Sequence, residues 1–388
     1  MTPRERVLAA LEHREPDRVP IDLGGNQTGI HRRAYERLLA HWGLEERVEI
    51  LDLVQQLARP SETVLERLGA DTRYVFAGGA ASFDAKVVRR ERGGRVWDDF
   101  TDEFGVTWSM PEDAPNYFDI THSPLAGLSL EEIRKHPFPR GDDPTRFEGL
   151  RERALRIRRE TPYAVVSGIS GVVYEICWYL RGLENLFLDM VERPEVLEAI
   201  IDRTLEFWLG WFRLFLDEAG DAVDVIMIGD DLTGQDGPLF SPRIYRSIVK
   251  PRQKALVQYI RSRTRAKIWY HSCGSIVAYI PDLIENGIDI LNPVQVSARG
   301  MDPAALKARF GGRLSFWGGA VDAQHVLPRA KPEEVRAHVR RNVEAFKPGG
   351  GYVFANVHNI QGDVPPENVV AMFEAAREYG TYAKGGTP

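Results

Sequence analysis

Residues 267–274 read KIWYHSCG and join an apolar, aromatic run to a His-x-Cys-Gly sequence. The run is typical of a buried strand, and the polar residues follow at its carboxyl end. Side chains two residues apart on an extended chain point to the same face, which places His271 and Cys273 together. Imidazole and thiolate are ligands that zinc favours. The pattern indicates either a strand tip that presents two metal ligands or a half-buried histidine beside a small core thiol.

Similar apolar runs recur along the second half of the chain, at 163–168, 223–228, 266–270, 287–291, 314–318 and 351–355. Amphipathic stretches of helix length lie between them, at 183–219, 241–264, 276–286, 302–310 and 332–346. This alternation predicts a parallel sheet built from βα units. Two N-terminal strand candidates, 18–25 and 72–76, bring the total to about eight, the number that closes a TIM (β/α)8 barrel. An open doubly wound sheet is the alternative, but no Gly-x-Gly-x-x-Gly opens a helix after a strand.

The N-terminal third begins with a helix whose start is signalled by Thr2, Pro3 and Glu5, a capping-box arrangement. Residues 80–125 differ from the rest because they carry alternating aromatic residues and no helical period. We therefore expect one α/β TIM-barrel domain over residues 1–388, with 80–125 as a β-rich insertion or flap.

Composition restricts the classes of function. The formal net charge of −6 gives no reason to expect nucleic acid or an anionic membrane as a partner. The two cysteines, Cys177 and Cys273, cannot form a disulfide framework and fit a reducing compartment. The N-terminus lacks the apolar run of a signal peptide, and no stretch approaches the ~20 apolar residues of a membrane span. We expect a cytoplasmic protein.

Polar residues fall at the same end of five successive predicted strands, whereas independent surface decoration would not be so regular. In a TIM barrel, functional residues come from the carboxyl ends of several strands. His358 follows the last strand, so His271, Cys273 and His358 are the candidate metal ligands. Asp230 and Asp231 are adjacent and should point to opposite faces; we expect Asp230 in the pocket as the catalytic carboxylate and Asp231 bonded locally.

Further candidates come from residues whose type is unusual for their position. Glu175 lies in an apolar stretch, where a carboxylate is costly unless it is paired or bound to metal. Tyr174 and Trp317 are candidates to line a flat pocket, although aromatic residues also pack the core. The amides of Gln295 and Asn356 are suited to hydrogen bonds with a substrate or with metal ligands.

The order and wording of these segments resemble the uroporphyrinogen decarboxylase superfamily, a TIM-barrel group. The resemblance rests on short motifs in an ordered succession: Thr2–Leu11, Pro16–Pro20, Asp230, Ser241-Pro242, Lys250-Pro251, His271–Gly274, Asn292-Pro293, Gly318-Gly319, Gly349–Tyr352 and Pro365–Asn368. It covers nearly the whole chain except the insertion.

The resemblance implies one of two chemistries. True decarboxylases of the superfamily carry an arginine-rich first tip for a substrate with many carboxylates, but here the corresponding residues 21–28 contain no arginine. In the cobamide-dependent methyltransferase branch, zinc is bound by His-x-Cys and a later cysteine. This chain keeps His271 and Cys273 and has His358 at the later position. A His/Cys/His set leaves an open fourth position and less thiolate charge, which favours polarising an oxygen, as an ether-cleaving demethylase needs.

The resemblance therefore implies a zinc-dependent methyltransferase that moves a methyl group between a small O- or S-methyl compound, or a thiol, and a corrinoid. The chain lacks an Asp-x-His-x-x-Gly corrinoid motif, so the corrinoid would come free or on a partner protein. Two alternatives stay open: a metal-independent decarboxylase that acts through Asp230, and a non-catalytic protein that binds a corrinoid or tetrapyrrole.

Overall fold

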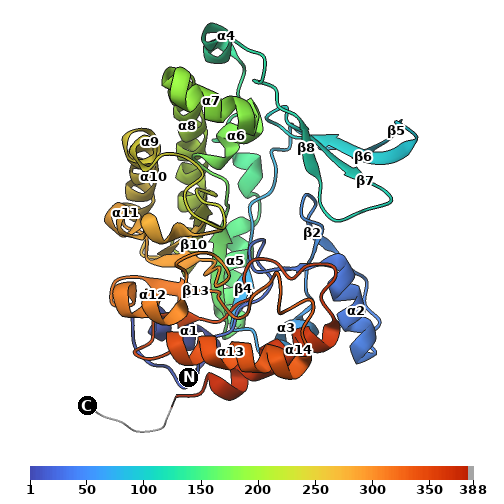
Figure 1. Ribbon diagram of the computed structural model, residues 1–388, viewed down its shortest axis with the longest axis vertical. Helices are drawn as coiled ribbons and strands as arrows, with labels where there is room; N and C mark the ends of the chain where they lie inside the picture. Colours follow the sequence, from blue (N-terminus) through green and yellow to red (C-terminus); the bar gives the residue numbers. More distant parts are fainter. Residues whose placement is uncertain (383–388) are drawn as a thin grey trace.

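The centre of the computed structural model, which describes residues 1–382, is a parallel sheet that curls into a barrel (Figure 1). Its seven strands are, in spatial order, β4 (Thr72–Tyr74), β9 (Ala164–Gly168), β10 (Val225–Gly229), β11 (Lys267–His271), β12 (Ile290–Asn292), β13 (Ser315–Trp317) and β14 (Tyr352–Val353). The segment around Ile21 closes the ring: the Asp22 N–H donates to the Phe354 carbonyl at 2.8 Å, and the Asp71 N–H donates to the Ile21 carbonyl at 2.7 Å. The predicted TIM barrel is confirmed.

Helices cover the outside of the barrel. They are α1 (Pro3–Leu11), α2 (Arg32–Trp42), α3 (Glu62–Leu68), α4 (Leu130–Lys135), α5 (Leu150–Glu160), α6 (Glu175–Arg181), α7 (Leu183–Glu192), α8 (Pro194–Ala219), α9 (Pro242–Ile244), α10 (Lys250–Arg261), α11 (Ile280–Asn286), α12 (Pro303–Phe310), α13 (Pro332–Phe346) and α14 (Pro366–Tyr379). Short 3-10 or π turns lie at Pro144–Phe147, Tyr245–Val249 and Ile276–Ala278. The helix predicted over 183–219 is divided at Arg193, because Pro194 bars the residue before it from helical geometry.

One end of the barrel is sealed by α1. Thr2 caps this helix through the predicted capping box with Glu5. Val7 and Leu11 of α1 pack against the apolar side chains that fill the barrel interior, among them Trp269 and Trp317, whose ring centroids are 4.7 Å apart. Because α1 covers this amino-terminal end of the strands, the barrel interior is reached from the opposite, carboxyl end, where the candidate ligands lie.

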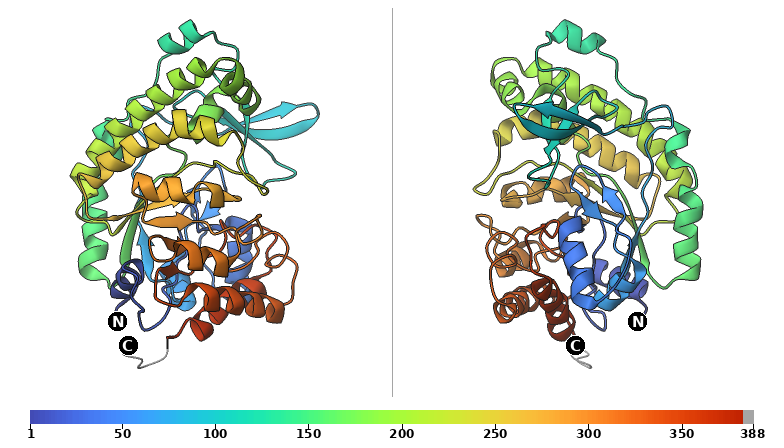
Figure 2. Two further views of the ribbon diagram at one scale, coloured as in Figure 1. Left: turned by 60° about the vertical axis from the view of Figure 1, so that its left-hand side comes forward. Right: turned by 90° about the vertical axis from the view of Figure 1, so that its right-hand side faces the viewer.

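The predicted insertion contains a separate antiparallel sheet, seen edge-on at the upper right of Figure 1 and from another side in Figure 2. Its strands are β5 (Val88–Arg92), β6 (Arg95–Thr101), β7 (Thr107–Pro111) and β8 (Asp119–His122). A third, small sheet holds β1 (Ile30–His31), β2 (Ile50–Asp52) and β3 (Leu57–Ala58). The Phe118 N–H donates to the Val54 carbonyl, and the Gln361 amide donates to the Tyr117 hydroxyl at 2.5 Å. These contacts place part of the insertion over the carboxyl end of the barrel.

Within residues 1–382, no helix is long and apolar enough to cross a membrane.

Candidate metal centre at the barrel mouth

His271, Cys273 and His358 meet at the carboxyl end of the barrel. His271 is the last residue of β11, Cys273 lies two residues further, and His358 stands in the loop after β14. One potential ligand atom from each residue lies within 4.8 Å of the others, and the two imidazole centroids are 5.3 Å apart. The structure thus brings the three ligands predicted from sequence to one place.

Asn292 fixes the orientation of the His271 ring. The Asn292 Oδ1 lies 2.6 Å from His271 Nδ1, and the Asn292 amide nitrogen donates to the Trp317 carbonyl at 3.0 Å. Since the amide nitrogen is committed to Trp317, Oδ1 must accept the Nδ1 proton. The Nε2 lone pair of His271 is then free, and it lies 3.5 Å from the Cys273 sulfur. Such a hydrogen bond to the non-ligating nitrogen is the usual support of a metal-bound histidine.

His358 reaches the cluster from a strained backbone. Its φ of 58° lies in the left-handed region, which residues other than glycine adopt uncommonly, although asparagine, aspartate and histidine do so more often than the rest. Its carbonyl accepts a hydrogen bond from the Asn356 amide. Non-glycine residues held in this region cluster at functional sites, where surrounding contacts stabilise them.

The donor set fits zinc. Zinc binds histidine nitrogen at about 2.0–2.1 Å and cysteine sulfur at about 2.3 Å, so two ligand atoms of one tetrahedral ion lie roughly 3.4–3.7 Å apart. The 3.5 Å between Cys273 Sγ and His271 Nε2 falls in that range. Burial lowers the pKa of His271 to about 4 and that of His358 to about 4, so both imidazoles are neutral near pH 7, the form that binds metal.

The two adjacent aspartates are oriented in the opposite way to our expectation. Asp231 Oδ1 accepts the Cys273 N–H at 2.8 Å and lies 3.9 Å from His271 Nε2. Asp230 is fully buried, and its Oδ1 accepts the N–H groups of three residues at the start of α6, Val173, Tyr174 and Glu175. The strand ends at Gly229, so strand alternation no longer fixes the side-chain direction beyond it.

Asp230 therefore occupies a position with every acceptor site engaged. Its Oδ2 accepts from the Gln253 amide at 3.1 Å and from the Tyr270 hydroxyl at 3.2 Å. Burial raises the pKa of Asp230 to about 6, against the effect of these donors. The carboxylate holds the amino end of α6 in place, and its hydrogen-bond donors do not include the side chains of the three metal-ligand candidates. Its predicted catalytic role stays a prediction.

Glu175 lies next to Asp231 at the first position of α6. Its two carboxyl oxygens accept hydrogen bonds from the Tyr179 hydroxyl and, at 3.2 Å, from the Asp231 N–H. Burial, and then the negative charge of Asp231, raise the pKa of Glu175 to about 8. The residue is therefore protonated at neutral pH in the metal-free protein.

The remaining predicted residues lie around the site or beneath it. The side-chain oxygen Oε1 of Gln295 accepts the Gly274 N–H at 2.8 Å, and Asn356 keeps a buried Oδ1 for which the described residues offer no partner. Tyr174 is buried against Phe240, with ring centroids 4.7 Å apart. Trp317 lies inside the barrel and donates to Asp22 at 2.8 Å, because its side chain points toward the interior rather than the mouth.

Sequence reasoning missed Asn292 and Asp231 as members of the site. Asn292 pairs with His271 across the parallel β11–β12 ladder, so its place depends on strand register. Its position directly after an apolar run was the available signal. No feature of the sequence distinguishes Asp231 from Asp230 as the residue that faces the site.

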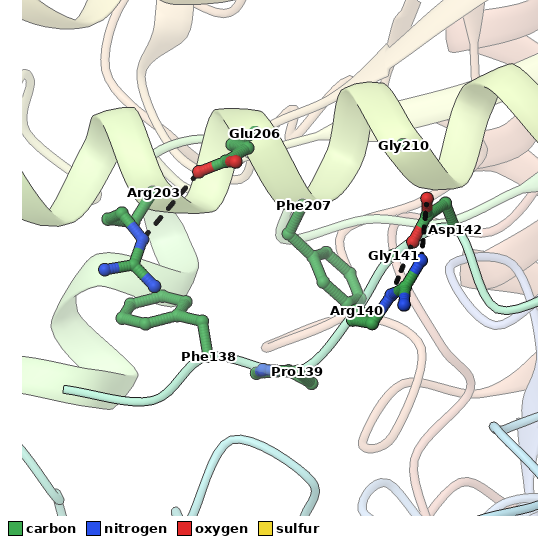
Figure 3. A pocket seen from close by; sticks show the side chains of 9 residues that line it. All are labelled: Phe138, Pro139, Arg140, Gly141, Asp142, Arg203, Glu206, Phe207 and Gly210. Carbon is green, nitrogen blue, oxygen red and sulfur yellow. Dashed lines mark hydrogen bonds and ion pairs between the residues drawn. The ribbon is translucent and has the colours of Figure 1, made fainter.

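A second cavity, of about 440 Å³, lies on the outside of the barrel between α8 and the residues before α5 (Figure 3). Its charged side chains pair among themselves: Arg140 with Asp142 at 3.1 Å, and Arg203 with Glu206 at 3.8 Å. None of the sequence-predicted site residues lines it.

The fold of this chain is similar to that of a solved protein structure. A solved structure described as a methyltransferase from Methanosarcina mazei superposes with a TM-score of 0.60, covering 98% of this chain and 99% of that one at 18% identity. At that identity the likeness shows a shared fold.

The curated relatives and the matching family model carry the same description, uroporphyrinogen decarboxylase. A uroporphyrinogen decarboxylase of Methylococcus capsulatus is 35% identical over 224 residues, which is 56% of this chain and 60% of the relative. One from Ectopseudomonas mendocina is 24% identical over 274 residues, 68% of this chain and 73% of the relative. The family model described as uroporphyrinogen decarboxylase (URO-D) matches residues 101–379. The chain belongs to the uroporphyrinogen decarboxylase family.

Proposed function

We propose that this protein is a zinc-dependent methyltransferase that moves a methyl group between a small O- or S-methyl compound, or a thiol, and a corrinoid. The observation that carries the proposal is the convergence of His271, Cys273 and His358 within 4.8 Å at the mouth of the barrel. Three protein ligands with one open position are the arrangement of catalytic rather than structural zinc sites.

The protein's own groups suit this chemistry. Zinc held there would stabilise negative charge on the oxygen or sulfur that gives up or receives the methyl group. Asn292 keeps the His271 lone pair directed at the site, and Asp231 lies 3.9 Å from the same nitrogen, where it can orient a group in the open position. The corrinoid would be supplied by a partner protein or bound free.

A decarboxylase is the second candidate, since the curated relatives carry that name. The structure offers little to a substrate with many carboxylates. In the first strand tip, residues 21–28, arginine is absent, and Asp22 is instead a buried acceptor for Thr72, Tyr74 and Trp317. This strand tip therefore presents no cation to a polyanionic substrate.

Two cysteines of the same chain provide the matched test. Cys177 is buried on α6, where its thiol donates to the Val173 carbonyl, and it lies outside the ligand cluster. The wild-type protein should contain about one zinc per chain, Cys273→Ala should lose most of it, and Cys177→Ala should retain it. Elemental analysis of the purified proteins measures this, and methyl transfer to or from a corrinoid, followed by its absorbance spectrum, should fall in parallel.

Each other outcome favours a named alternative. Zinc that persists unchanged in Cys273→Ala would place the metal elsewhere and remove the main support of the proposal. Loss of carbon dioxide from an acid substrate by zinc-free protein would favour the decarboxylase. Tight corrinoid or tetrapyrrole binding without any turnover would favour a binding protein.

A further inference from the structure

Side-chain amides gather around the third ligand candidate at the barrel mouth. We name this set the amide cluster: Asn26, Gln27, Gln55, Asn356, Asn359 and Gln361. Its members come from residues 26–55, after the segment that closes the ring, and from residues 356–361, after β14. The Gly29 N–H donates to Asn359 Oδ1 at 2.7 Å, so the two ends of the barrel sequence meet in this cluster.

Asn359 and Gln55 form the scaffold of the amide cluster. The Asn359 nitrogen donates to the Asn26 carbonyl at 3.0 Å and to Gln55 Oε1 at 2.7 Å. The Gln55 nitrogen donates to the same Asn26 carbonyl at 3.1 Å. Because the Asn359 oxygen is also engaged, by Gly29, these two amides hold the cluster together and are not available to a ligand.

Asn356 and Gln361 are oriented so that their oxygens remain for a ligand. The Asn356 nitrogen donates to the His358 carbonyl. The Gln361 nitrogen donates to the Tyr117 hydroxyl at 2.5 Å and to the Asn359 carbonyl at 3.0 Å. An amide nitrogen carries two hydrogens, so these contacts commit the nitrogen of Gln361 and fix which way its oxygen points.

Three oxygens of the cluster lack a hydrogen-bond partner among residues 1–382. They are Asn26 Oδ1, Gln27 Oε1 and Asn356 Oδ1, and all three are buried. Buried polar atoms without a partner are rare in folded proteins and call for a ligand or a water molecule. An amide oxygen only accepts hydrogen bonds, so a complementary ligand brings N–H or O–H donors.

The amide cluster borders the metal centre on two sides. Asn356 contacts the backbone of His358. Gln361 holds Tyr117 of the insertion, whose pKa is raised by burial and further by the negative charges of Asp52 and Cys273. The Tyr117 hydroxyl is therefore within electrostatic range of the Cys273 sulfur. A ligand on the cluster would lie beside the three metal-ligand candidates.

The charged groups near the cluster are few and mostly committed. Asp52 accepts from the backbone and side-chain nitrogens of Gln55. Arg33 and Arg37 each donate to an oxygen of the protein. Arg32 keeps a buried Nε that has no partner within the described chain, so it is the cation on which a polycarboxylate would depend. The cluster itself offers neutral hydrogen-bonding groups.

A primary amide is the ligand group that matches such a cluster. It carries a donor and an acceptor, so it pairs reciprocally with a side-chain amide, whereas a carboxylate brings only acceptors to the oxygens of Asn356 and Gln361. The rim of a corrin ring bears acetamide and propionamide groups. The rim of a porphyrinogen with many carboxylates bears acids in their place.

We propose that Asn26, Gln27, Asn356 and Gln361 bind the amide-bearing rim of a corrin ring. The inference deepens the proposed function and rests on it, because the bound ring exchanges a methyl group only if the adjacent ligands hold zinc. Binding of the ring itself depends on the amide cluster and needs neither zinc nor a methyl donor.

Two corrinoids with different rims test the proposal. Dicyanocobinamide carries amides and dicyanocobyrinic acid carries carboxylates, and in both the two cyanides keep protein groups off the cobalt. Equilibrium dialysis with the full chain, read by absorbance, measures the dissociation constants. We expect dicyanocobinamide to bind about tenfold more tightly than dicyanocobyrinic acid or uroporphyrin. Equal or tighter binding of either polycarboxylate, or no binding of dicyanocobinamide, overturns the proposal.

Variants of the cluster provide the matched comparison. Gln27→Leu and Gln361→Leu should each weaken dicyanocobinamide binding about tenfold, since each loses a hydrogen-bonding amide. Gln258→Leu, which changes an exposed glutamine on α10, should leave it unchanged. If Gln27→Leu does not fold, as judged by circular dichroism, Asn26→Ala takes its place. Unchanged binding in the folded cluster variants contradicts the inference.

An added cation should reverse the selectivity. Gln361→Arg replaces an amide by a guanidinium, which pairs with carboxylates, and should favour dicyanocobyrinic acid over dicyanocobinamide. Uroporphyrin binding by the wild type that disappears in Arg32→Gln would instead assign this side of the mouth to a polycarboxylate.

The two proposals fail separately. Stoichiometric zinc and corrinoid-dependent methyl transfer without a preference for the amide rim would remove the assignment of the cluster and leave the methyltransferase standing. Selective binding of dicyanocobinamide by a protein that takes up no zinc would preserve the assignment and remove the proposed chemistry.

Discussion

The two ends of the barrel differ in the state of their ionisable side chains, which are charged and ion-paired at one end and uncharged at the other. At the end sealed by α1, Arg6 pairs with Asp71 at 2.6 Å and with Asp17 at 2.7 Å, and Arg18 pairs with Asp71 at 2.7 Å. At the mouth, His271 is buried and Cys273 and His358 are half-buried, and loss of hydration shifts the pKa of each toward its uncharged form.

The difference separates residues that hold the fold from residues that hold a ligand. Paired charges at the sealed end satisfy each other, so their removal should cost stability. The ligand-type side chains at the mouth are uncharged and do little for stability, which agrees with the metal-binding role that we propose for them. A substitution at one end should therefore change either stability or zinc binding, but not both.

The largest expected effect is on stability at the sealed end. Asp71→Ala leaves Arg6 and Arg18 without their shared partner and should lower the free energy of unfolding by about 3–5 kcal/mol. Zinc content of the folded fraction should not change. Asp113→Ala, which removes an exposed pair with Arg95, is the control and should cost less than about 1 kcal/mol. Denaturant titration measures both, and equal losses would contradict the distinction between the ends.

Asp230 and Asp231 test the same distinction between a residue that holds the fold and a residue that serves the site. Asp230→Asn loses acceptor sites for donors from α6, Gln253 and Tyr270, and should destabilise the fold by about 2–3 kcal/mol while zinc is retained. Asp231→Asn should leave the unfolding free energy within about 1 kcal/mol and reduce methyl transfer. Thermal melts and activity assays on both variants decide. The reverse result would restore the orientation that the sequence first suggested.

A smaller effect, on zinc affinity, is expected at Asn292, whose side chain accepts the His271 Nδ1 proton. Asn292→Ala removes the acceptor for the Nδ1 proton and should weaken zinc binding about 10- to 100-fold in a competition assay with a chelator. Asn292→Asp keeps an acceptor oxygen and should bind zinc more tightly than Asn292→Ala. If the two variants bind zinc equally, His271 is oriented by other contacts.

The smallest effect is a pH dependence at Glu175. Its pKa in the folded protein is raised to about 8 from the ordinary 4.5, so the wild type gains stability from this group below pH 4.5 and loses it as pH rises through about 8. Glu175→Gln stays neutral and should therefore be more stable than wild type at pH 9 but not at pH 5. Melting temperatures of the zinc-free proteins at the two pH values measure this. A constant difference would mean that Glu175 titrates normally.

The barrel itself was readable from the sequence because strands and helices alternate with clear boundaries. Helix α13 spans the predicted 332–346 and begins at Pro332, and α12 begins after the Asp302 cap. The first strand was less visible: the segment predicted over 18–25 forms bridges only at Arg18 and Ile21. Local patterns could not show that this segment closes the ring.

The candidate site was readable only as a set of residue types. His-x-Cys at a strand tip predicted two ligands, and a third tip supplied His358. Side-chain direction beyond a strand end depends on the turn that follows, which is why Asp230 and Asp231 were interchanged. Register between parallel strands depends on the whole barrel, so the pairing of Asn292 with His271 could not be derived from either segment alone.

Closure of the ring by its first and last segments has a consequence for synthesis on the ribosome. The Gly29 N–H donates to Asn359, 330 residues later in the chain, next to the third ligand candidate His358. The loop-closure entropy of such a contact is paid only when nearly the entire polypeptide has emerged. Until then the edge of the Ile21 segment that faces Phe354 stays unpaired, and the candidate metal site lacks His358. We therefore expect the proposed zinc to bind late in synthesis, and stalled chains that end before β14 to be metal-free and prone to aggregate through that open edge.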